Sequence, residues 1–204
     1  MNKNFLTAAI LALFILISTN ATAADTYTID RGHTTIGFSV RHMVISNVKG
    51  QFNKFVGEFV FDPKSVDLKS AEIKIDVGSI DTNERKRDKH LRGPDFLDVD
   101  KFRTITFKLK SCTNKGGGKL NATGDITIRG VTKTINLTGE FLGAIKDPWG
   151  NYRAGFSATG EISRKDFGIV YNRLLETGGM VVDDKIKLLI EVEGVKEKRK
   201  KKEK

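Results

Sequence analysis

The feature of this sequence that most constrains its fold is an alternation of apolar and polar residues with a period of two, which recurs in about eight segments. In the segment 72–77, for example, Ile73, Ile75 and Val77 are separated by charged residues. Strands that are buried on both faces read as continuous apolar runs, whereas alternating strands have one buried face and one wetted face. The pattern therefore predicts an all-β chain built from antiparallel sheet, and it excludes a doubly wound α/β fold.

The alternating segments are separated by sequences that favour tight turns. The segments span residues 36–42, 55–61, 73–77, 105–109, 120–128, 131–141, 154–162 and 186–192. Between them lie the dipeptide Arg129-Gly130, the glycine-rich run 114–118 and the segment 147–151, which contains a proline and a glycine. Such residues are typical of hairpin connections. We therefore expect neighbouring strands to be joined mainly by hairpins.

One long insertion, residues 78–101, breaks this pattern. Within it, residues 83–91 are mostly polar and contain neither glycine nor proline. Asp81 and Thr82 precede this run, and side chains of these types cap helix N-termini by accepting backbone hydrogen bonds. The insertion therefore predicts one short helix.

Eight alternating strands can close into a barrel or pack as a two-sheet sandwich, and the alternation alone leaves both open. The inward positions combine large and small side chains, namely Phe38, Phe55, Phe59, Phe107, Phe141 and Phe156 with Gly57, Ala122, Gly124, Gly139, Ala154, Ala158 and Gly160. In a barrel, small inward residues would leave a narrow apolar channel for a slender ligand, although glycine in a strand also marks bulges and bends. We favour the barrel, because closure also removes exposed strand edges.

The first 23 residues have the organisation of a secretory signal peptide. Lys3 precedes an apolar run over residues 5–17, and small residues follow at positions 21–23. The run of 13 residues is shorter than the roughly 20 that a membrane-spanning helix requires. We therefore predict a cleaved leader over residues 1–23, export to the periplasm and a single β-barrel domain over residues 24–195.

The net charge of +10 is concentrated at the C-terminus. Residues 196–204 contain seven Lys or Arg and two Glu, whereas residues 24–195 carry a net charge of only +4. This distribution argues against a nucleic-acid-binding surface on the domain. We interpret residues 196–204 as a disordered basic tail, which is either solvated or docked on an anionic membrane face.

Motifs for catalysis or metal binding are scarce. The histidines His33, His42 and His90 do not form the His-Glu-x-x-His pattern of a zinc helix. The glycine run before Lys119 lacks the Ser or Thr of a phosphate-binding loop, and the single Cys112 is interpreted as a structural residue. The sequence therefore predicts no catalytic residue, no metal site and no cofactor.

His42 is the most informative polar residue, because it continues the inward register of Ile36, Phe38 and Val40. One interpretation is a histidine whose hydrogen bonds are satisfied at the end of a strand. Another is a polar contact for the head group of a ligand, since a mostly apolar pocket orients its ligand with few polar groups. A third, enzymatic alternative uses His42 as an acid or base acting on a bound lipid.

Five segments in order resemble the YceI-like family of exported lipid-binding proteins. The segments are 27–42 (YTIDRGHTTIGFSVRH), 50–55 (GQFNKF), 79–97 with SIDTN, RDKHL and DFL, 124–133 (GDITIRGVTK) and 163–169 (SRKDFGI). One departure is visible, because Phe102-Arg103 stands where the family commonly has Tyr-Pro.

The resemblance implies an extended, eight-stranded, lipocalin-like antiparallel barrel that holds a polyisoprenoid, an isoprenoid quinone or its precursor, or another long-chain lipid such as a fatty amide, without chemistry. It also implies that two chains often pair as a homodimer. The ligand-binding residues that it implies within the lumen are Ile36, Phe38, Val40, Phe55, Phe59, Phe107, Ile126, Phe141, Phe156 and Phe167. Those that it implies at the mouth are Arg41, His42, Asp81 and His90.

Overall fold

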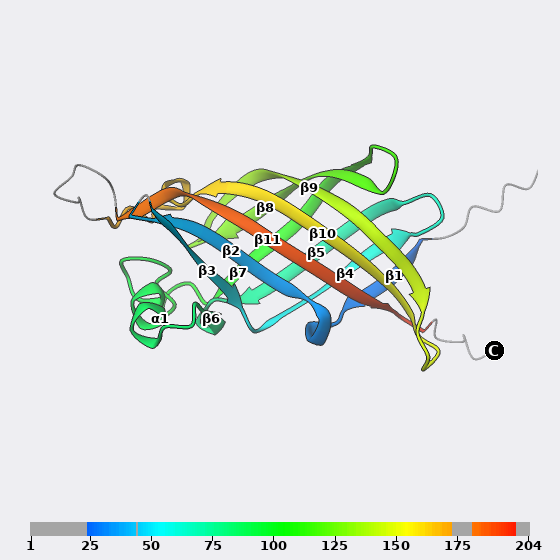
Figure 1. The fold of residues 1–204 in the computed structure, drawn as a ribbon, viewed down its shortest axis with the longest axis horizontal. Helices are drawn as coiled ribbons and strands as arrows, with labels where there is room; N and C mark the ends of the chain where they lie inside the picture. The colour runs from blue at the N-terminus through cyan, green and yellow to red at the C-terminus, as the bar shows by residue number, and fades with distance from the viewer. Residues whose placement is uncertain (1–23, 44, 173–180, 199–204) are drawn as a thin grey trace, which may run out of the picture.

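The structure is a computed structural model, and it describes residues 24–43, 45–172 and 181–198. This part of the chain is built mainly from strands (Figure 1). The strands are β1 (Asp25–Ile29), β2 (Thr35–His42), β3 (Ser46–Phe52), β4 (Phe55–Asp62), β5 (Asp67–Asp76), β6 (Ile80–Asp81), β7 (Thr104–Asn114), β8 (Lys119–Ile128), β9 (Val131–Lys146), β10 (Tyr152–Ser163) and β11 (Val182–Lys196). The helical elements are α1 (Arg85–Arg92) and the 3-10 turns η1 (Arg31–His33), η2 (Val77–Ser79) and η3 (Arg164–Phe167).

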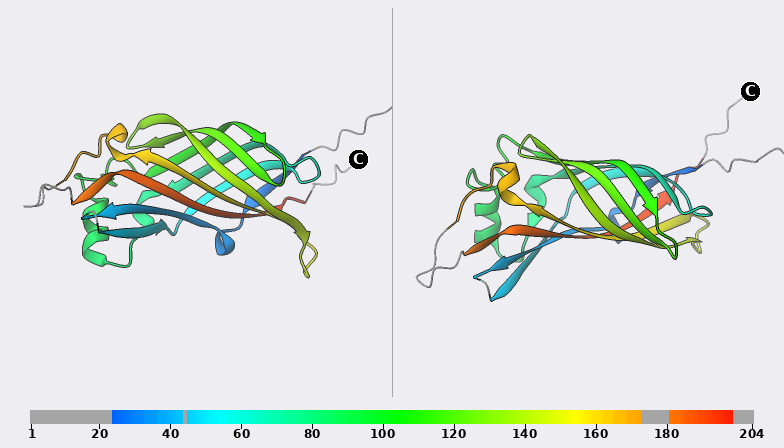
Figure 2. Two further views of the ribbon diagram at one scale, coloured as in Figure 1. Left: turned by 45° about the horizontal axis from the view of Figure 1, so that its top comes forward. Right: turned by 90° about the horizontal axis from the view of Figure 1, so that it is seen from above.

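Eight antiparallel strands close into a barrel. The order around the ring is β1, β4, β5, β7, β8, β9, β10 and β11, and pairing of β1 with β11 completes it. The strands run obliquely along the long axis of the molecule, so that the barrel is elongated (Figures 1 and 2). The structure therefore confirms the predicted all-β, eight-stranded, lipocalin-like barrel and excludes the sandwich.

The closing strand is not one of the segments that the alternation identified. Strand β1 is only five residues long, and it takes the place in the ring that the sequence assigned to residues 36–42. Those residues form β2, which pairs with β11 further along its edge, where Ile36 lies opposite Ile190. Strands β3 and β6 then extend the sheet beyond β2. Strands β1, β3 and β6 were thus missed, because β1 and β3 each have only two large apolar residues in phase and β6 has only two residues in all.

The predicted turns lie where the sequence placed them. Arg129 and Gly130 form the two-residue connection between β8 and β9, with φ of 50° and 74°. Positive φ at both positions suits the right-handed twist of a hairpin. The glycine run joins β7 to β8, and residues 147–151 join β9 to β10.

The helix in the insertion is confirmed, but its predicted caps are wrong. Glu84 caps α1, because its carboxylate accepts hydrogen bonds from the backbone amides of Lys86 and Arg87 at 3.0 and 2.6 Å. Asp81 instead accepts from the backbone amide of Asn83 at 2.9 Å and closes the preceding turn. Thr82 donates its hydroxyl to Asp88, in the interior of α1, at 2.5 Å.

At two inward glycines, Gly57 and Gly124, neighbouring atoms pack directly against the glycine Cα and leave no open space. A Cβ atom at Gly124 would lie 2.4 Å from the Phe107 ring, and one at Gly57 would lie 2.5 Å from the backbone oxygen of Glu72. Both distances are shorter than van der Waals contact. The interpretation of these two glycines as channel-forming was therefore wrong, because the neighbouring ring or backbone already occupies the space that a side chain would fill.

The structure describes part of the predicted C-terminal tail and none of the predicted leader. Residues 1–23 and 199–204 lie outside the described residues. Strand β11 continues through Lys196, and the backbone amide of Glu197 donates to Thr26 at 2.8 Å, so these first residues of the predicted tail join the sheet. No helix in the described part of the chain has the length and apolar character of a membrane span.

Candidate ligand cavity

A cavity of about 480 Å³ lies inside the barrel. Its wall comes from the inward faces of the strands and is mostly aliphatic, with Ile36, Ile126 and Leu188 as examples. Small side chains at Ala122 and Ala158 also face it, in agreement with their interpretation as channel-lining residues. A cavity of this size and composition suits an apolar ligand.

Five aromatic residues close one end of this cavity, and we call them the aromatic floor: Tyr27, Phe59, Phe61, Phe141 and Phe156. Phe61 lies at the centre, fully buried, with ring centroids 4.9 Å from Phe141 and 4.8 Å from Phe156. Phe59 and Phe156 face the cavity, whereas the other three lie behind them. The lumen is therefore blocked at the end where β1 begins and β11 ends.

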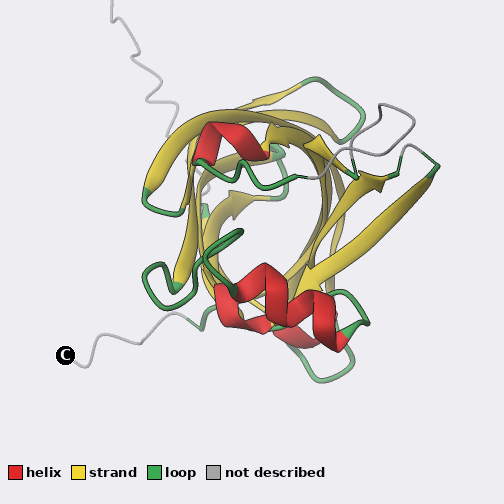
Figure 3. Ribbon diagram, turned by 90° about the vertical axis from the view of Figure 1, so that its left-hand side faces the viewer, coloured by secondary structure: helices red, strands yellow, loops and turns green. Residues whose placement is uncertain are grey.

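The cavity reaches the opposite end of the barrel, which we call the mouth. Figure 3 looks onto this end, with α1 below the ring of strands and η3 above it. The imidazole of His90 makes edge-on contacts with the rings of Phe96 and Tyr171, each with a centroid distance of 4.9 Å. Its Nε2 also lies 3.0 Å from the carboxylate of Asp95. His90 thus joins α1 to the segment that follows η3 across the mouth.

The polar groups that α1 contributes to the wall already have protein partners. The guanidinium of Arg87 donates through Nε to the Thr82 hydroxyl and through Nη2 to the Thr82 carbonyl, both at 2.7 Å. The Thr82 hydroxyl in turn donates to Asp88. These contacts hold the start of α1 against the barrel and leave the cavity wall with few polar groups to offer a ligand.

Arg164 is a second buried polar group on the wall, with a side chain only 3% exposed. Its guanidinium donates to the carbonyls of Ile169, Tyr171 and Asp183 at 2.8, 2.7 and 3.0 Å, and to the carboxylate of Asp184 at 2.8 Å. One side chain therefore ties the start of β11 to the segment 169–171 beside the mouth.

His42 lies on the cavity wall at the end of β2, as its register predicts. Among the described residues, the ion pairs of histidine involve His33 and His90, and no carboxylate lies within ion-pair distance of the His42 ring. A carboxylate that orients the imidazole is a usual part of a histidine acid or base. The described residues do not provide one.

The structure brings most of the predicted site residues together. Ten of the fourteen line the cavity: Ile36, Phe38, Val40, His42, Phe59, His90, Phe107, Ile126, Phe156 and Phe167. Their role in binding remains a prediction.

The other four predicted residues, Arg41, Phe55, Asp81 and Phe141, lie off the cavity wall. Arg41 is exposed, because it points outward between two lining neighbours. Phe55 is buried in the core where β4 begins, and Phe141 belongs to the aromatic floor. The Asp81 carboxylate is held by Asn53 and Asn83, and the hydrogen bond from the Asn83 amide lowers its pKa.

The wall residues that sequence reasoning missed include Thr82, Arg87, Arg164 and Tyr171. Thr82 was interpreted as a helix cap, and Arg87 lies in the mostly polar run that predicted the helix. Arg164 stands beside Lys165 in a polar run with no alternation. No local pattern distinguishes the buried arginine from its exposed neighbour, because the contacts that bury it come from residues 169–184.

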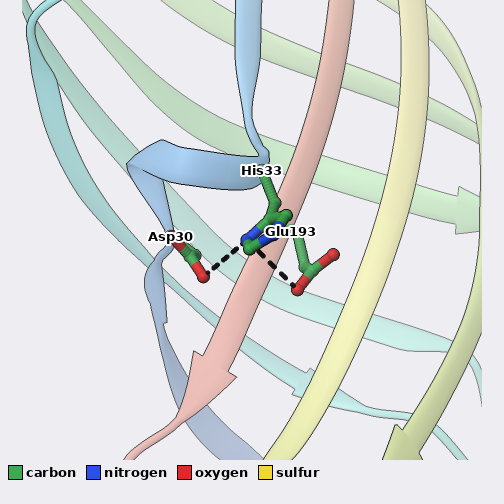
Figure 4. Close-up of side chains that lie close together, drawn as sticks. All are labelled: Asp30, His33 and Glu193. Atoms are coloured by element: carbon green, nitrogen blue, oxygen red, sulfur yellow. Dashed lines mark hydrogen bonds and ion pairs between the residues drawn. The ribbon is translucent and has the colours of Figure 1, made fainter. Parts of the chain in front are cut away.

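One cluster outside the barrel has the composition of a metal site (Figure 4). The Nδ1 atom of His33 lies 2.9 Å from Asp30 Oδ2 and 4.0 Å from Glu193 Oε1. The Arg153 guanidinium already donates to the same two oxygens at 2.7 and 2.5 Å. A cation at this position would compete with the arginine, so we assign the cluster a structural role.

Arg153 also sets the electrostatics of this cluster. Its guanidinium is the largest influence on Asp30 and lowers the pKa of that carboxyl to about 2. Through Nε it donates to Asp147 at 2.8 Å and lowers the pKa of Asp147 to about 2 as well. The three carboxylates raise the pKa of Arg153 in return. One arginine thus joins η1, the β9–β10 turn and β11.

Comparison with known proteins agrees with this architecture. Residues 27–194 match the YceI-like domain family. A UPF0312 protein of Vibrio cholerae is 46% identical over 169 residues, which cover 82% of this chain and 89% of the relative. The crystal structure of the Campylobacter jejuni YCEI protein superposes with a TM-score of 0.68 at 35% identity, covering 78% of this chain and 90% of that one.

A more distant structure shares the fold. A polyisoprenoid binding domain from Saccharophagus degradans superposes with a TM-score of 0.59 at 11% identity, covering 84% of this chain and 98% of that domain. At this identity the likeness concerns the fold alone.

Proposed function

This chain belongs to the YceI-like domain family, and from that premise we propose that it is a carrier which holds one long apolar lipid in the lumen of its barrel. The observation that carries the proposal is the cavity of about 480 Å³ with an almost entirely apolar wall. The ligand chain enters through the mouth and ends against the aromatic floor. Its head group stays at the mouth, near His42 and His90.

Burial of hydrocarbon supplies the binding free energy. At about 25 cal/mol per Å² of apolar surface, a slender chain that loses a few hundred Å² to the lumen gains on the order of 10 kcal/mol before ordering costs. No polar contact within the lumen is needed for this gain. The carrier therefore discriminates mainly by the width and length of the apolar chain.

A binding role is favoured over catalysis by the state of the polar groups on the wall. Arg87 and Arg164 already donate hydrogen bonds to backbone and side-chain partners within the protein. His42 lacks an orienting carboxylate among the described residues, so the enzymatic alternative has an incomplete acid or base.

The ligand class and the compartment are the finer parts of the proposal. The Saccharophagus degradans domain is described as polyisoprenoid binding, and its shared fold supports a polyisoprenoid or another long-chain lipid here. The signal-peptide pattern of residues 1–23 supports export to the periplasm, where such a lipid needs a protected path through water. Pairing of two chains as a homodimer is an expectation from the family resemblance.

Native mass spectrometry of gently purified protein tests the proposal. We expect an added mass that corresponds to one elongated lipid, or uptake of an added isoprenoid by protein that has been stripped of lipid. Ala122→Phe, which fills the lumen, should abolish uptake, whereas Asn121→Phe on the outward face of the same strand should not. Stripped protein that ignores isoprenoids would refute the proposal.

The enzymatic alternative has its own readout. His42→Ala should leave lipid uptake largely intact, and a carrier shows no turnover that this change could remove. Turnover of the bound lipid by the unaltered protein, lost in His42→Ala, would establish the alternative.

A further inference from the structure

The hairpin between β9 and β10 projects from the end of the barrel opposite the mouth (Figures 1 and 2). It carries four exposed large apolar side chains: Leu142, Ile145, Trp149 and Tyr152. Trp149, at the tip, is 81% exposed, and Ile145 is 65% exposed. Exposed large apolar residues gathered on one projecting element mark an interaction site more often than scattered ones do.

The strand register places these side chains on both faces of the hairpin. Ile145 lies opposite Arg153, whereas Lys146 lies opposite Tyr152. Because directly paired residues share a face and successive residues alternate, Ile145 and Tyr152 point to opposite sides. A partner that covers them must surround the tip of the hairpin, as a fluid apolar phase does and a flat protein surface does not.

The tip is held rigidly in this exposed conformation. The Asp147 carboxylate accepts hydrogen bonds from the backbone amides of Trp149 and Asn151 at 3.0 and 2.8 Å. It also binds the Asn151 amide group at 3.1 Å and the Arg153 guanidinium at 2.8 Å. Trp149 is therefore presented to the solvent by a turn with a fixed backbone, so that insertion of the tip would require little ordering of the main chain.

Two lysines lie beside the hairpin. The ammonium groups of Lys146 and Lys196 lie 5.8 and 5.4 Å from the centroid of the Tyr152 ring, and Lys196 also pairs with Asp25. Strand β11 ends beside the hairpin at Lys196, and residues 198–204 then add six Lys or Arg and one Glu. The hairpin thus lies beside the end of β11, and the sequence becomes strongly basic after that strand.

We propose that the β9–β10 hairpin and the basic C-terminal residues dock the protein on an anionic lipid bilayer. Trp149 and Ile145 enter the interface, where tryptophan is favoured because its ring is amphipathic. The lysines around the hairpin bind anionic head groups. Docked in this way, the barrel stands with its floor toward the bilayer and its mouth toward the aqueous phase, where a partner can reach the lipid.

Trp149 is the only tryptophan in the chain, so its fluorescence reports directly on this tip. With vesicles that contain phosphatidylglycerol, we expect a blue shift of emission and quenching by brominated acyl chains, and neither change with pure phosphatidylcholine. The absence of binding, or binding without a change in Trp149 emission, would overturn the proposal. A blue shift that grows with protein concentration alone would identify a second copy of the chain as the partner and would also overturn it.

Two matched substitutions separate docking from a general effect of surface hydrophobicity. Ile145 and Val56 are each 65% exposed on a strand, but Val56 lies on the barrel wall away from the hairpin. Ile145→Ser should lower the vesicle partition coefficient about tenfold, because roughly one buried aliphatic side chain is lost. Val56→Ser should leave it unchanged. Equal effects of the two substitutions would contradict the docking geometry.

The charge contribution is tested by removal of residues 198–204. We expect the affinity for phosphatidylglycerol vesicles to fall tenfold or more at low salt, on the order of what several lysines near an anionic surface supply. The difference from the full chain should vanish at high salt. Ala122→Phe, which fills the lumen, should dock normally, so that docking can be judged whether or not the carrier function holds.

Discussion

The ring of Tyr27 stacks on the ring of Phe59, with a centroid distance of 5.1 Å and an angle of 4° between the planes. Gly194 of β11 lies directly against this pair, because a Cβ atom there would be 2.4 Å from the Phe59 ring and 3.0 Å from the Tyr27 Cβ. The floor of the lumen therefore depends on the pairing of β1 with β11, which also closes the barrel. One contact region sets both the closure and the depth of the cavity.

Gly194→Ala should destabilise the protein by about 1 to 3 kcal/mol, because the added methyl overpacks the floor. Gly155→Ala is the matched control in the neighbouring strand, since its nearest contact would be an ordinary 3.9 Å. Urea denaturation of both variants measures the difference. Equal stability of the two would show that the floor tolerates the methyl group.

Phe156→Ala should deepen the lumen, because Phe156 faces the cavity and contacts Phe59, Phe61 and Phe141. We expect a loss of about 3 to 5 kcal/mol of stability and a shift of preference toward longer lipid chains. Competition between a short and a long isoprenoid, read by native mass spectrometry, measures the preference. Phe102→Ala, away from the lumen, should leave the ratio unchanged, and an unchanged ratio in Phe156→Ala would mean that the floor does not limit chain length.

Arg164→Ala should cost about 3 kcal/mol or more, because it leaves buried carbonyls at the mouth without donors. Lys165→Ala is a close control, since Lys165 binds the same Asp184 but its side chain is 46% exposed. We expect its effect to be below about 1 kcal/mol. Thermal or urea unfolding distinguishes the two, and similar losses would contradict the buried role of Arg164.

The Arg153 cluster predicts a specific pH dependence. Asp30 and Asp147 have pKa values of about 2 in the folded protein, below the ordinary 3.8. A carboxyl group whose pKa is lower in the folded than in the unfolded protein stabilises the fold at any pH above its pKa in the unfolded chain. This stabilisation is lost as the pH falls from about 4 toward 2, where the carboxylates become protonated. Arg153→Gln should therefore lower the urea midpoint at pH 7, and the difference from the unaltered protein should shrink over that acid range.

Arg129→Gln serves as the control for the pH experiment, because Arg129 donates to the Gly168 carbonyl and not to a carboxylate. Its effect on stability should not change between pH 4 and pH 2. A constant difference for Arg153→Gln over the same range would mean that the two carboxyls titrate normally.

The barrel itself could be predicted, because alternation is a property of each strand alone. Residues 120–128 alternate over their whole length, and they form β8 within one residue of the predicted bounds. The two-residue turn Arg129-Gly130 could likewise be predicted from its residue types. Such local signals do not depend on what packs against them.

The shape of the lumen could not be predicted in the same way. Phe59 and Phe61 have the same pattern as the lining residues, yet Phe59 faces the cavity and Phe61 lies behind it in the floor. The difference arises because β1, β4, β9 and β10 bring their aromatic rings to one end of the barrel. The burial of Arg164 is also a tertiary effect, since its partners lie 5 to 20 residues further along the chain.

Cys112 gives the most direct test of the central claim that the lipid lies inside the barrel. It is the only cysteine in the chain, it lines the cavity, and burial raises the pKa of its thiol. We predict that a bound isoprenoid slows modification of Cys112 by N-ethylmaleimide at least tenfold, while an outward thiol in Asn121→Cys with Cys112→Ser reacts equally fast with and without lipid. An unchanged rate at Cys112 in protein that mass spectrometry shows to be loaded would place the lipid outside the lumen and contradict the account.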